Sequence, residues 1–208
     1  MRRAVMRVAV ALAALGPGAN EPARAADPMT CSDATALRQQ TTALGLERWC
    51  ERAGSPAVRH GPYVVLHPNG QLYVRGEYRE GVPAGAWKSW YPGGAQSGEA
   101  QFHDGRPTGM VLGWYENGRG SFVGAFRDGV VTGRIEVFDA DGRLRMASDY
   151  DGKGVELGRQ AWDESGQAID PKSADASRLG QAVMQTSPLL YWALMASSVV
   201  RQMAPLRD

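Results

Sequence analysis

Residues 85–108 read GAWKSWYPGGAQSGEAQFHDGRPT, and this pattern returns every 24 residues between residues 61 and 166. Each copy carries a glycine at a fixed place with a large apolar residue four positions before it. In the first four copies, a second aromatic follows the glycine by eight positions and is preceded two positions earlier by a small residue. A fixed period of this length is typical of stacked repeats. The recurring positions are Gly70, Gly94, Gly118, Gly142 and Gly166; Leu66, Trp90, Trp114, Phe138 and Trp162; Tyr78, Phe102, Phe126 and Tyr150; and Gly76, Ala100, Gly124 and Ser148.

Each 24-residue unit is predicted to form one β-hairpin. In the second unit, residues 86–91 alternate as a strand does, residues 92–94 form a turn, and residues 96–102 form the returning strand. Asn-Gly and Asp-Gly pairs occupy the turns of other units, where glycine adopts positive φ without penalty. The sequence therefore predicts an all-β repeat protein of stacked hairpins over residues 61–170, with four units and a partial fifth.

The alternation places Trp87 and Tyr91 on one face of the second hairpin and Lys88 and Trp90 on the other. The small residue before each second aromatic leaves room for a ring of the next hairpin. We expect the series Trp90, Trp114 and Trp162 to fill that room and to form the core.

The opposite face would then present an aromatic stripe to solvent. We predict that Trp87, Tyr91 and Tyr115 lie in this stripe, with Arg79 and Arg106 nearby. Aromatic residues beside arginine are typical anchors of protein interfaces. The alternative is that a two-sided sheet buries both series of rings.

Residues 1–25 have the pattern of an export signal. Arg2, Arg3 and Arg7 precede a short apolar run, and Ala23-Arg24-Ala25 offers a cleavage site before Ala26. An uncleaved anchor is the alternative. Because these residues hold four arginines against one glutamate, the remainder of the chain is mildly acidic. That balance disfavours nucleic acid as a partner, and the signal predicts a periplasmic or secreted protein that is free or associated with a membrane.

Export would place Cys31 and Cys50, the two cysteines of the chain, outside the reducing cytoplasm. In an oxidising compartment they are predicted to pair with each other. The bond would close a loop of 19 residues, which corresponds to about 3 kcal/mol of stabilisation. Residues 26–60 are therefore predicted to form an N-terminal cap tied by a disulfide, with a short hairpin or an irregular segment over residues 36–52.

The pattern changes over residues 171–208. Residues 173–178 are small and polar, and no charge occurs over residues 179–200. Ser187-Pro188 is a typical helix start, with serine as N-cap and proline in the first turn. We expect a linker followed by a helix that either packs on the last hairpin or associates with a membrane.

The element Gly-x-Trp-x-x-Trp-Tyr-Pro-x-Gly at residues 85–94, with Gly-Ala-Phe-Arg-Asp-Gly at residues 124–129, resembles the bacterial variant of the MORN repeat. The lead-in residues 49–51 and 60–62 resemble those of exported bacterial proteins that carry these repeats, several of which have antitoxin-like names. The resemblance implies an elongated, twisted sheet of stacked hairpins that serves as a scaffold for contact with proteins, lipids or membrane surfaces, without catalysis. The fourth unit departs from the pattern, because Phe138-Asp139 replaces the usual Trp-Tyr pair.

Residues suited to catalysis or metal binding are sparse. His60, His67 and His103 lack the spacing of a metal site, and the glycine-rich stretches lack the Lys-Ser/Thr of a phosphate loop. We therefore expect no enzyme activity, no cofactor and no metal. Three hypotheses remain: a scaffold that binds an envelope protein, a module of the membrane surface, and an antitoxin-like protein.

Overall fold

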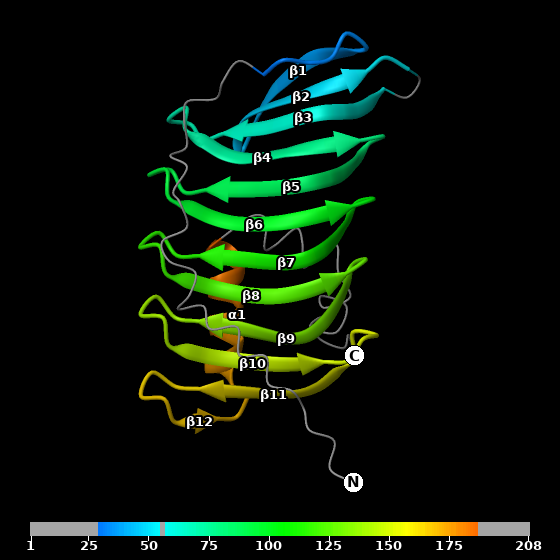
Figure 1. Cartoon of the computed structure of the whole chain (residues 1–208). Helices are drawn as coiled ribbons and strands as arrows, with labels where there is room; N and C mark the ends of the chain where they lie inside the picture. The colour runs from blue at the N-terminus through cyan, green and yellow to red at the C-terminus, as the bar shows by residue number, and fades with distance from the viewer. Residues whose placement is uncertain (1–28, 55–56, 187–208) are drawn as a thin grey trace, which may run out of the picture.

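The computed structural model describes residues 29–54 and 57–186, which form one antiparallel sheet of twelve strands followed by a helix (Figure 1). The strands lie side by side in chain order, so every strand pairs with its neighbours in the sequence. The predicted all-β array of successive hairpins is confirmed. The elements are β1 Thr35–Thr42, β2 Gly45–Arg52, β3 Val58–Leu66, β4 Leu72–Arg79, β5 Val82–Trp90, β6 Gln96–His103, β7 Arg106–Trp114, β8 Gly120–Arg127, β9 Val130–Phe138, β10 Leu144–Tyr150, β11 Glu156–Trp162, β12 Ala168–Ile169 and α1 Ala174–Thr186.

The recurring glycines end the turns that lie in a row at one end of the strands. We call this row of turns the Gly94 edge, as distinct from the edge strands β1 and β12. Gly94 has a φ of 89°, and its N–H donates to the carbonyl of Tyr91 at 2.8 Å. The same hydrogen bond closes the turn of Gly118 onto Tyr115 at 2.9 Å. An L-residue rarely adopts this φ, so the conformation of the turn explains why glycine recurs here.

Two-residue turns join the units at the opposite edge, the Gly105 edge. Asp104 and Gly105 both have positive φ, at 48° and 76°, the conformation of a type I′ turn. The N–H of Gly105 then donates to the carbonyl of Pro83 in the preceding turn region at 3.0 Å, and Gly129 donates in the same way to Pro107 at 2.9 Å. Each hairpin is therefore linked to its predecessor through the turn itself.

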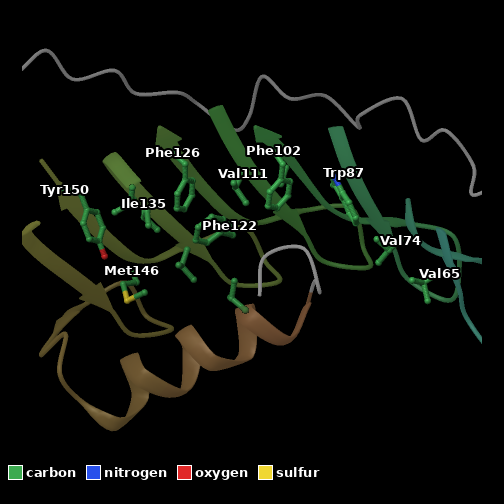
Figure 2. Close-up of a cluster of buried hydrophobic side chains, with 14 of the residues drawn as sticks. Val65, Val74, Trp87, Phe102, Val111, Phe122, Phe126, Ile135, Met146 and Tyr150 are labelled. Atoms are coloured by element: carbon green, nitrogen blue, oxygen red, sulfur yellow. The ribbon is translucent and has the colours of Figure 1, made fainter. Parts of the chain in front are cut away.

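The core lies on one face of the sheet and runs along a column of residues that also repeats every 24 positions (Figure 2). Each column residue lies directly opposite a small residue of the paired strand, which gives it room to lie across the sheet. The cross-strand pairs are Tyr63 with Gly76, Trp87 with Ala100, Val111 with Gly124, and Ile135 with Ser148. Phe102, Phe126 and Tyr150 of the predicted second aromatic series pack in the same cluster.

The core face is therefore the one that the sequence assigned to solvent. A Cβ added to Gly76 would lie 2.1 Å from Cδ2 of Trp87, so Trp87 fills the space that we expected the Trp90 series to fill. Trp90 packs instead in a smaller cluster with Val64, Leu66 and Leu72. Trp114 and Trp162 are half-buried. The predicted alternation is confirmed, but the predicted core face is wrong, and Trp87 and Trp90 are both buried, in separate clusters.

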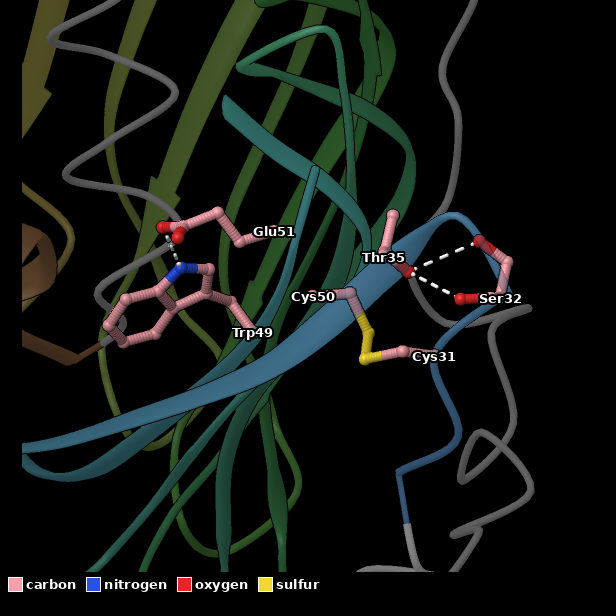
Figure 3. The surroundings of a disulfide bond; sticks show 6 residues. All are labelled: Cys31, Ser32, Thr35, Trp49, Cys50 and Glu51. Atoms are coloured by element: carbon pink, nitrogen blue, oxygen red, sulfur yellow. Dashed lines mark hydrogen bonds between the residues drawn. A yellow bond between two sulfur atoms is a disulfide. The ribbon is translucent and has the colours of Figure 1, made fainter. Parts of the chain in front are cut away.

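The N-terminal cap is a regular hairpin that extends the sheet by two strands. β1 pairs with β2 without a register shift, and β2 continues onto β3. The predicted Cys31–Cys50 disulfide is present and ties the segment before β1 to β2, with a Cα–Cα distance of 5.6 Å (Figure 3). Cys50 is 1% exposed, so the bond is anchored in packed structure.

A helix is present ahead of the predicted helix start at Ser187-Pro188. α1 starts at Ala174, and the Ser173 hydroxyl accepts a hydrogen bond from the N–H of Ala176, as an N-cap does. Residues 173–178, expected to be a linker, thus form its first turns. Its buried residues Ala176 and Val183 face the sheet, where α1 contacts β8 and β10.

Several predicted segments lie outside the described residues: the export signal over residues 1–25 and the helix start at Ser187-Pro188. Within the described part of the chain, no helix has the length and apolar character needed to cross a membrane.

The connection from the fourth hairpin to the partial fifth unit is longer than the two-residue turns of the Gly105 edge. Asp151 begins a loop that ends at Val155, and its carboxylate accepts hydrogen bonds from the N–H groups of Lys153 and Val155. The pairing of β10 with β11 shifts by one residue between Asp149 and Tyr150. Because Gly142 and Gly166 remain 24 residues apart, the longer connection is accommodated by shorter flanking strands, β10 and β11 of seven residues each, and by a bulge beside it.

Candidate interaction surface

The five residues predicted to form an exposed stripe do not lie together. Tyr91 and Tyr115 belong to turns of the Gly94 edge, whereas Arg79 and Arg106 are exposed at the Gly105 edge, one strand length or roughly 25 Å away. Trp87 lies between them in the core and is 1% exposed. The predicted exposure of Trp87 is therefore wrong. Binding by the other four residues stays a prediction, but they cannot act as one patch.

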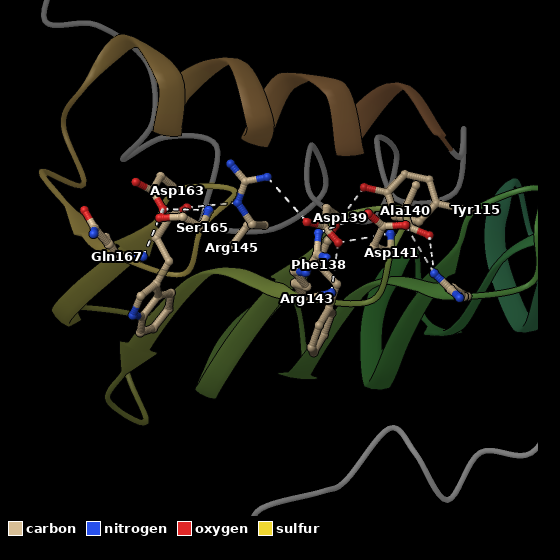
Figure 4. A network of polar contacts seen from close by, with 12 residues as sticks. Tyr115, Phe138, Asp139, Ala140, Asp141, Arg143, Arg145, Asp163, Ser165 and Gln167 are labelled. Atoms are coloured by element: carbon tan, nitrogen blue, oxygen red, sulfur yellow. Dashed lines mark hydrogen bonds and ion pairs between the residues drawn. The ribbon is translucent and has the colours of Figure 1, made fainter.

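Tyr91 and Tyr115 link neighbouring hairpins. The Tyr91 hydroxyl donates to the carbonyl of Trp114 at 2.9 Å, and the Tyr115 hydroxyl donates to the carbonyl of Phe138 at 2.7 Å (Figure 4). Burial, together with the charge of Asp139, raises the pKa of Tyr115. Both rings are half-buried. The recurrence of tyrosine at this position is thus explained by the hydrogen bond that it makes to the next hairpin.

Other residues of these turns also contact a backbone carbonyl of the next unit in the chain. A ring nitrogen of His67 lies 2.9 Å from the carbonyl of Trp90, and Nε of Arg145 donates to the carbonyl of Trp162 at 2.9 Å. The amides of Asn69 and Asn117 donate to the carbonyls of Pro92 and Ala140. The Gly94 edge is therefore a ladder of side-chain links between successive turns.

A group of aromatic and charged side chains, some buried and some half-exposed, lies at the N-terminal end of the core face. We call Glu47, Trp49, Arg59, Tyr63 and Tyr78 the Arg59 cluster. The Arg59 guanidinium lies over three rings, with its Cζ 4.8 Å from the centroid of Trp49, 5.5 Å from that of Tyr63 and 5.4 Å from that of Tyr78. β2, β3 and β4 place these side chains on one face.

A buried carboxylate holds the Arg59 cluster together. Glu47 is 7% exposed, and its Oε1 accepts from Nη2 of Arg59 at 2.8 Å and from the Tyr63 hydroxyl at 2.9 Å. Burial tends to lower the pKa of Arg59, but Tyr78 and Glu47 outweigh it and the pKa is raised. Burial and Glu47 raise the pKa of Tyr63. Arg59 therefore stays charged and Tyr63 stays a neutral hydrogen-bond donor at neutral pH.

The Arg59 cluster joins the core on one side and solvent on the other. Tyr63 and Tyr78 pack against Trp87, with ring centroids 5.4 Å and 5.3 Å away. Trp49 and Tyr78 remain half-exposed, and the Trp49 indole donates to Glu51, which also pairs with Arg38 at 3.0 Å. A rigid aromatic and arginine surface with a charged rim is the composition of an interface anchor.

Sequence reasoning missed this cluster because Trp49 and Arg59 precede the first repeat and Glu47 gives no pattern of its own. One signal was available. Tyr63 stands exactly 24 residues before Trp87, which places it at the head of the core column.

A shallow pocket of about 630 Å³ separates α1 from the last turns of the Gly94 edge. Arg145 and Arg178 line it, yet Arg145 already pairs with Asp139 at 3.5 Å and Arg178 with Asp175 at 3.4 Å. Over the described ranges, no three His, Cys, Asp or Glu side chains gather closely enough to hold a metal ion. The Arg59 cluster is therefore the better candidate site.

The fold and this surface define a class: a single-sheet β-hairpin repeat protein with an anchored N-terminal hairpin. No family model and no curated protein matches the chain. Among solved structures, the accessory secretory protein 1, 2 and 3 structure of Streptococcus pneumoniae is 14% identical over 52% of this chain and 20% of that chain, with a TM-score of 0.31. TarM is 12% identical over 65% of this chain and 18% of that chain, with a TM-score of 0.21. The protein spans about a fifth of the length of each.

Proposed function

We propose that this protein is an exported, non-catalytic scaffold of MORN-type repeats that contacts another protein of the cell envelope through the Arg59 cluster. The hairpin array is a repeat sheet, and the 24-residue pattern supports its assignment to the MORN type. The Cys31–Cys50 disulfide is typical of proteins that work outside the reducing cytoplasm.

One observation carries the proposal. Most positions that repeat are engaged inside the fold, whereas Trp49 and Arg59 of the Arg59 cluster precede the first repeat and occur at one place in the array. Tyr91 and Tyr115 donate to backbone carbonyls, and Trp87 is buried. Specific binding needs a surface that differs from unit to unit. The half-exposed Trp49 and Tyr78 beside Arg59 provide one.

The proposal can be tested by site-specific crosslinking in the intact envelope. A photoreactive residue replaces Trp49 in one variant and Gln101, exposed on the outer face of β6, in a matched control. We expect a discrete adduct of one mass from position 49, and its loss when Tyr78→Ala is added. Identical adducts from both positions, or none from position 49, would contradict binding at the Arg59 cluster.

A further inference from the structure

β1 is the terminal strand of the sheet, and no described residue pairs with its outer side. It pairs with β2 over all eight residues from Thr35 to Thr42 without a bulge. The opposite end of the sheet is different, because β12 has two residues and the chain then turns into α1. One end of the array therefore presents a long, regular edge.

The edge of β1 lacks the features that usually block pairing with another strand, such as proline, bulges and several charges. Arg38 is its single charged residue, and Nε of Arg38 is bound to Glu51 at 3.0 Å. Leu37 on β1 and Leu44 in the adjoining turn are 48% and 50% exposed. The edge is thus almost uncharged and flanked by exposed apolar groups.

The backbone groups that face outward on β1 can be identified from the pairing. Thr42 stands opposite Gly45 across a two-residue turn, so Thr42 exchanges hydrogen bonds with β2 and alternate residues do the same. The N–H and C=O groups of the residues in between point away from the sheet. These residues are Thr35, Leu37, Gln39 and Thr41.

We propose that β1 pairs antiparallel with β1 of a second copy of this chain, which joins two twelve-stranded sheets across a two-fold axis at Gln39. Such an axis keeps each face of the sheet continuous, so residues that meet must lie on the same face. The axis can then pass through Gln39 or through Arg38 near the middle of the strand. Only these two central registers use nearly the whole edge.

Charge selects between the two registers. With the axis at Arg38, two guanidinium groups would stand directly opposite each other, which is unfavourable. With the axis at Gln39, Arg38 meets Gln40, Leu37 meets Thr41, and the two Gln39 residues exchange backbone hydrogen bonds. A heterologous partner would not need this match of the strand with itself. The self-association stands whether or not the Arg59 cluster binds a partner.

A cysteine scan of the full chain tests the register. Gln39→Cys would lie opposite its own copy in a hydrogen-bonded pair with Cα atoms about 5.5 Å apart, within the disulfide range of about 4.4–6.8 Å. Cys31 and Cys50 are paired with each other and no described cysteine is free, so crosslinking would report on the introduced thiol. We expect mild oxidation to link Gln39→Cys dimers, whereas Arg38→Cys stays unlinked. Crosslinking at position 38 and not at 39 would overturn the proposed register.

Sedimentation equilibrium of the unmodified chain tests the association itself. We expect a dimer that dissociates on dilution, and at least tenfold weaker association for Gln39→Pro, which removes an outward N–H and is tolerated at an edge. Far-UV circular dichroism and thermal unfolding would verify that this variant folds. A monomeric native chain at all concentrations, or a folded Gln39→Pro variant that dimerises as tightly as the native chain, would overturn the proposal.

Discussion

The Tyr115 hydroxyl donates a 2.7 Å hydrogen bond to the backbone carbonyl of Phe138, 23 residues further along the chain. The bond joins the turn of one hairpin to the strand end of the next. Tyr115→Phe removes the donor and keeps the ring, so the carbonyl loses this partner. We expect a loss of about 1 kcal/mol in the free energy of unfolding, measured by urea denaturation. Tyr73→Phe is the control, because no hydrogen bond joins the Tyr73 hydroxyl to a described residue; equal effects in the two variants would contradict the proposed link.

Gly76 is required because of the space taken by Trp87. A methyl group at position 76 would overlap the indole, with 2.1 Å between the new Cβ and Cδ2 of Trp87. Gly76→Ala should therefore destabilise the protein by about 1–3 kcal/mol in urea denaturation. Gly152→Ala should change stability little, because nothing lies within 4 Å of its added Cβ.

A second substitution tests whether the clash with the indole is the cause. Trp87→Leu opens space at the same site, so its combination with Gly76→Ala should cost less than the sum of the two single changes. Strictly additive losses in the free energy of unfolding would show that position 76 requires glycine for the backbone conformation and not to leave space for the Trp87 ring.

The Cys31–Cys50 disulfide should stabilise the N-terminal hairpin. Its loop of 19 residues corresponds to about 3 kcal/mol in the chain-entropy description. A reductant should lower the urea midpoint of the native protein and leave that of a Cys31→Ala/Cys50→Ala variant unchanged. A native midpoint that does not respond to reduction, once free thiols are verified, would contradict this role.

Asp163 should make the last turn sensitive to acid. Its carboxylate accepts hydrogen bonds from the Ser165 hydroxyl and from the N–H groups of Gln167 and Ser165, and these contacts lower its pKa. A lowered folded-state pKa gives stability that is fully present above the ordinary pKa of aspartate and is lost as the pH falls through the lowered value. Asp163→Ala should therefore be less stable than the native protein at pH 7, and the difference should narrow in acid.

The matched control for this titration is Glu164→Ala, next in the chain and exposed. Its effect on unfolding should be small and should follow a different pH course. If the Asp163→Ala difference stays constant from pH 7 to pH 2, the turn is not stabilised by the carboxylate.

The turns could be predicted from the sequence because the chemistry of a turn is local: Gly94 and Gly118 are needed at positive φ, whatever surrounds them. The choice of core face could not, because Trp87 and Trp90 are both large aromatics and alternation alone does not say which side is buried. Deciding it requires the cross-strand register, which places Trp87 opposite Ala100.

The Arg59 cluster and the helix start show two other limits. Arg59 reaches Glu47 across paired strands 12 residues apart in sequence, and no local pattern predicts that contact. The start of α1 has a weaker sequence signal than Ser187-Pro188, because its N-cap Ser173 is followed by small and polar residues and not by a proline in the first turn.

The links at the two sheet edges also determine how such a chain can change in length during evolution. His67 contacts the carbonyl of Trp90, while Tyr91 contacts that of Trp114 in the same way. If residues 85–108 were deleted, His67 would face Trp114 across an equivalent joint, and the N–H of Gly129, which donates to the carbonyl of Pro107, would meet that of Pro83 in the same way. Gain or loss of whole 24-residue segments therefore preserves every joint, whereas an insertion of any other length must be absorbed in a loop.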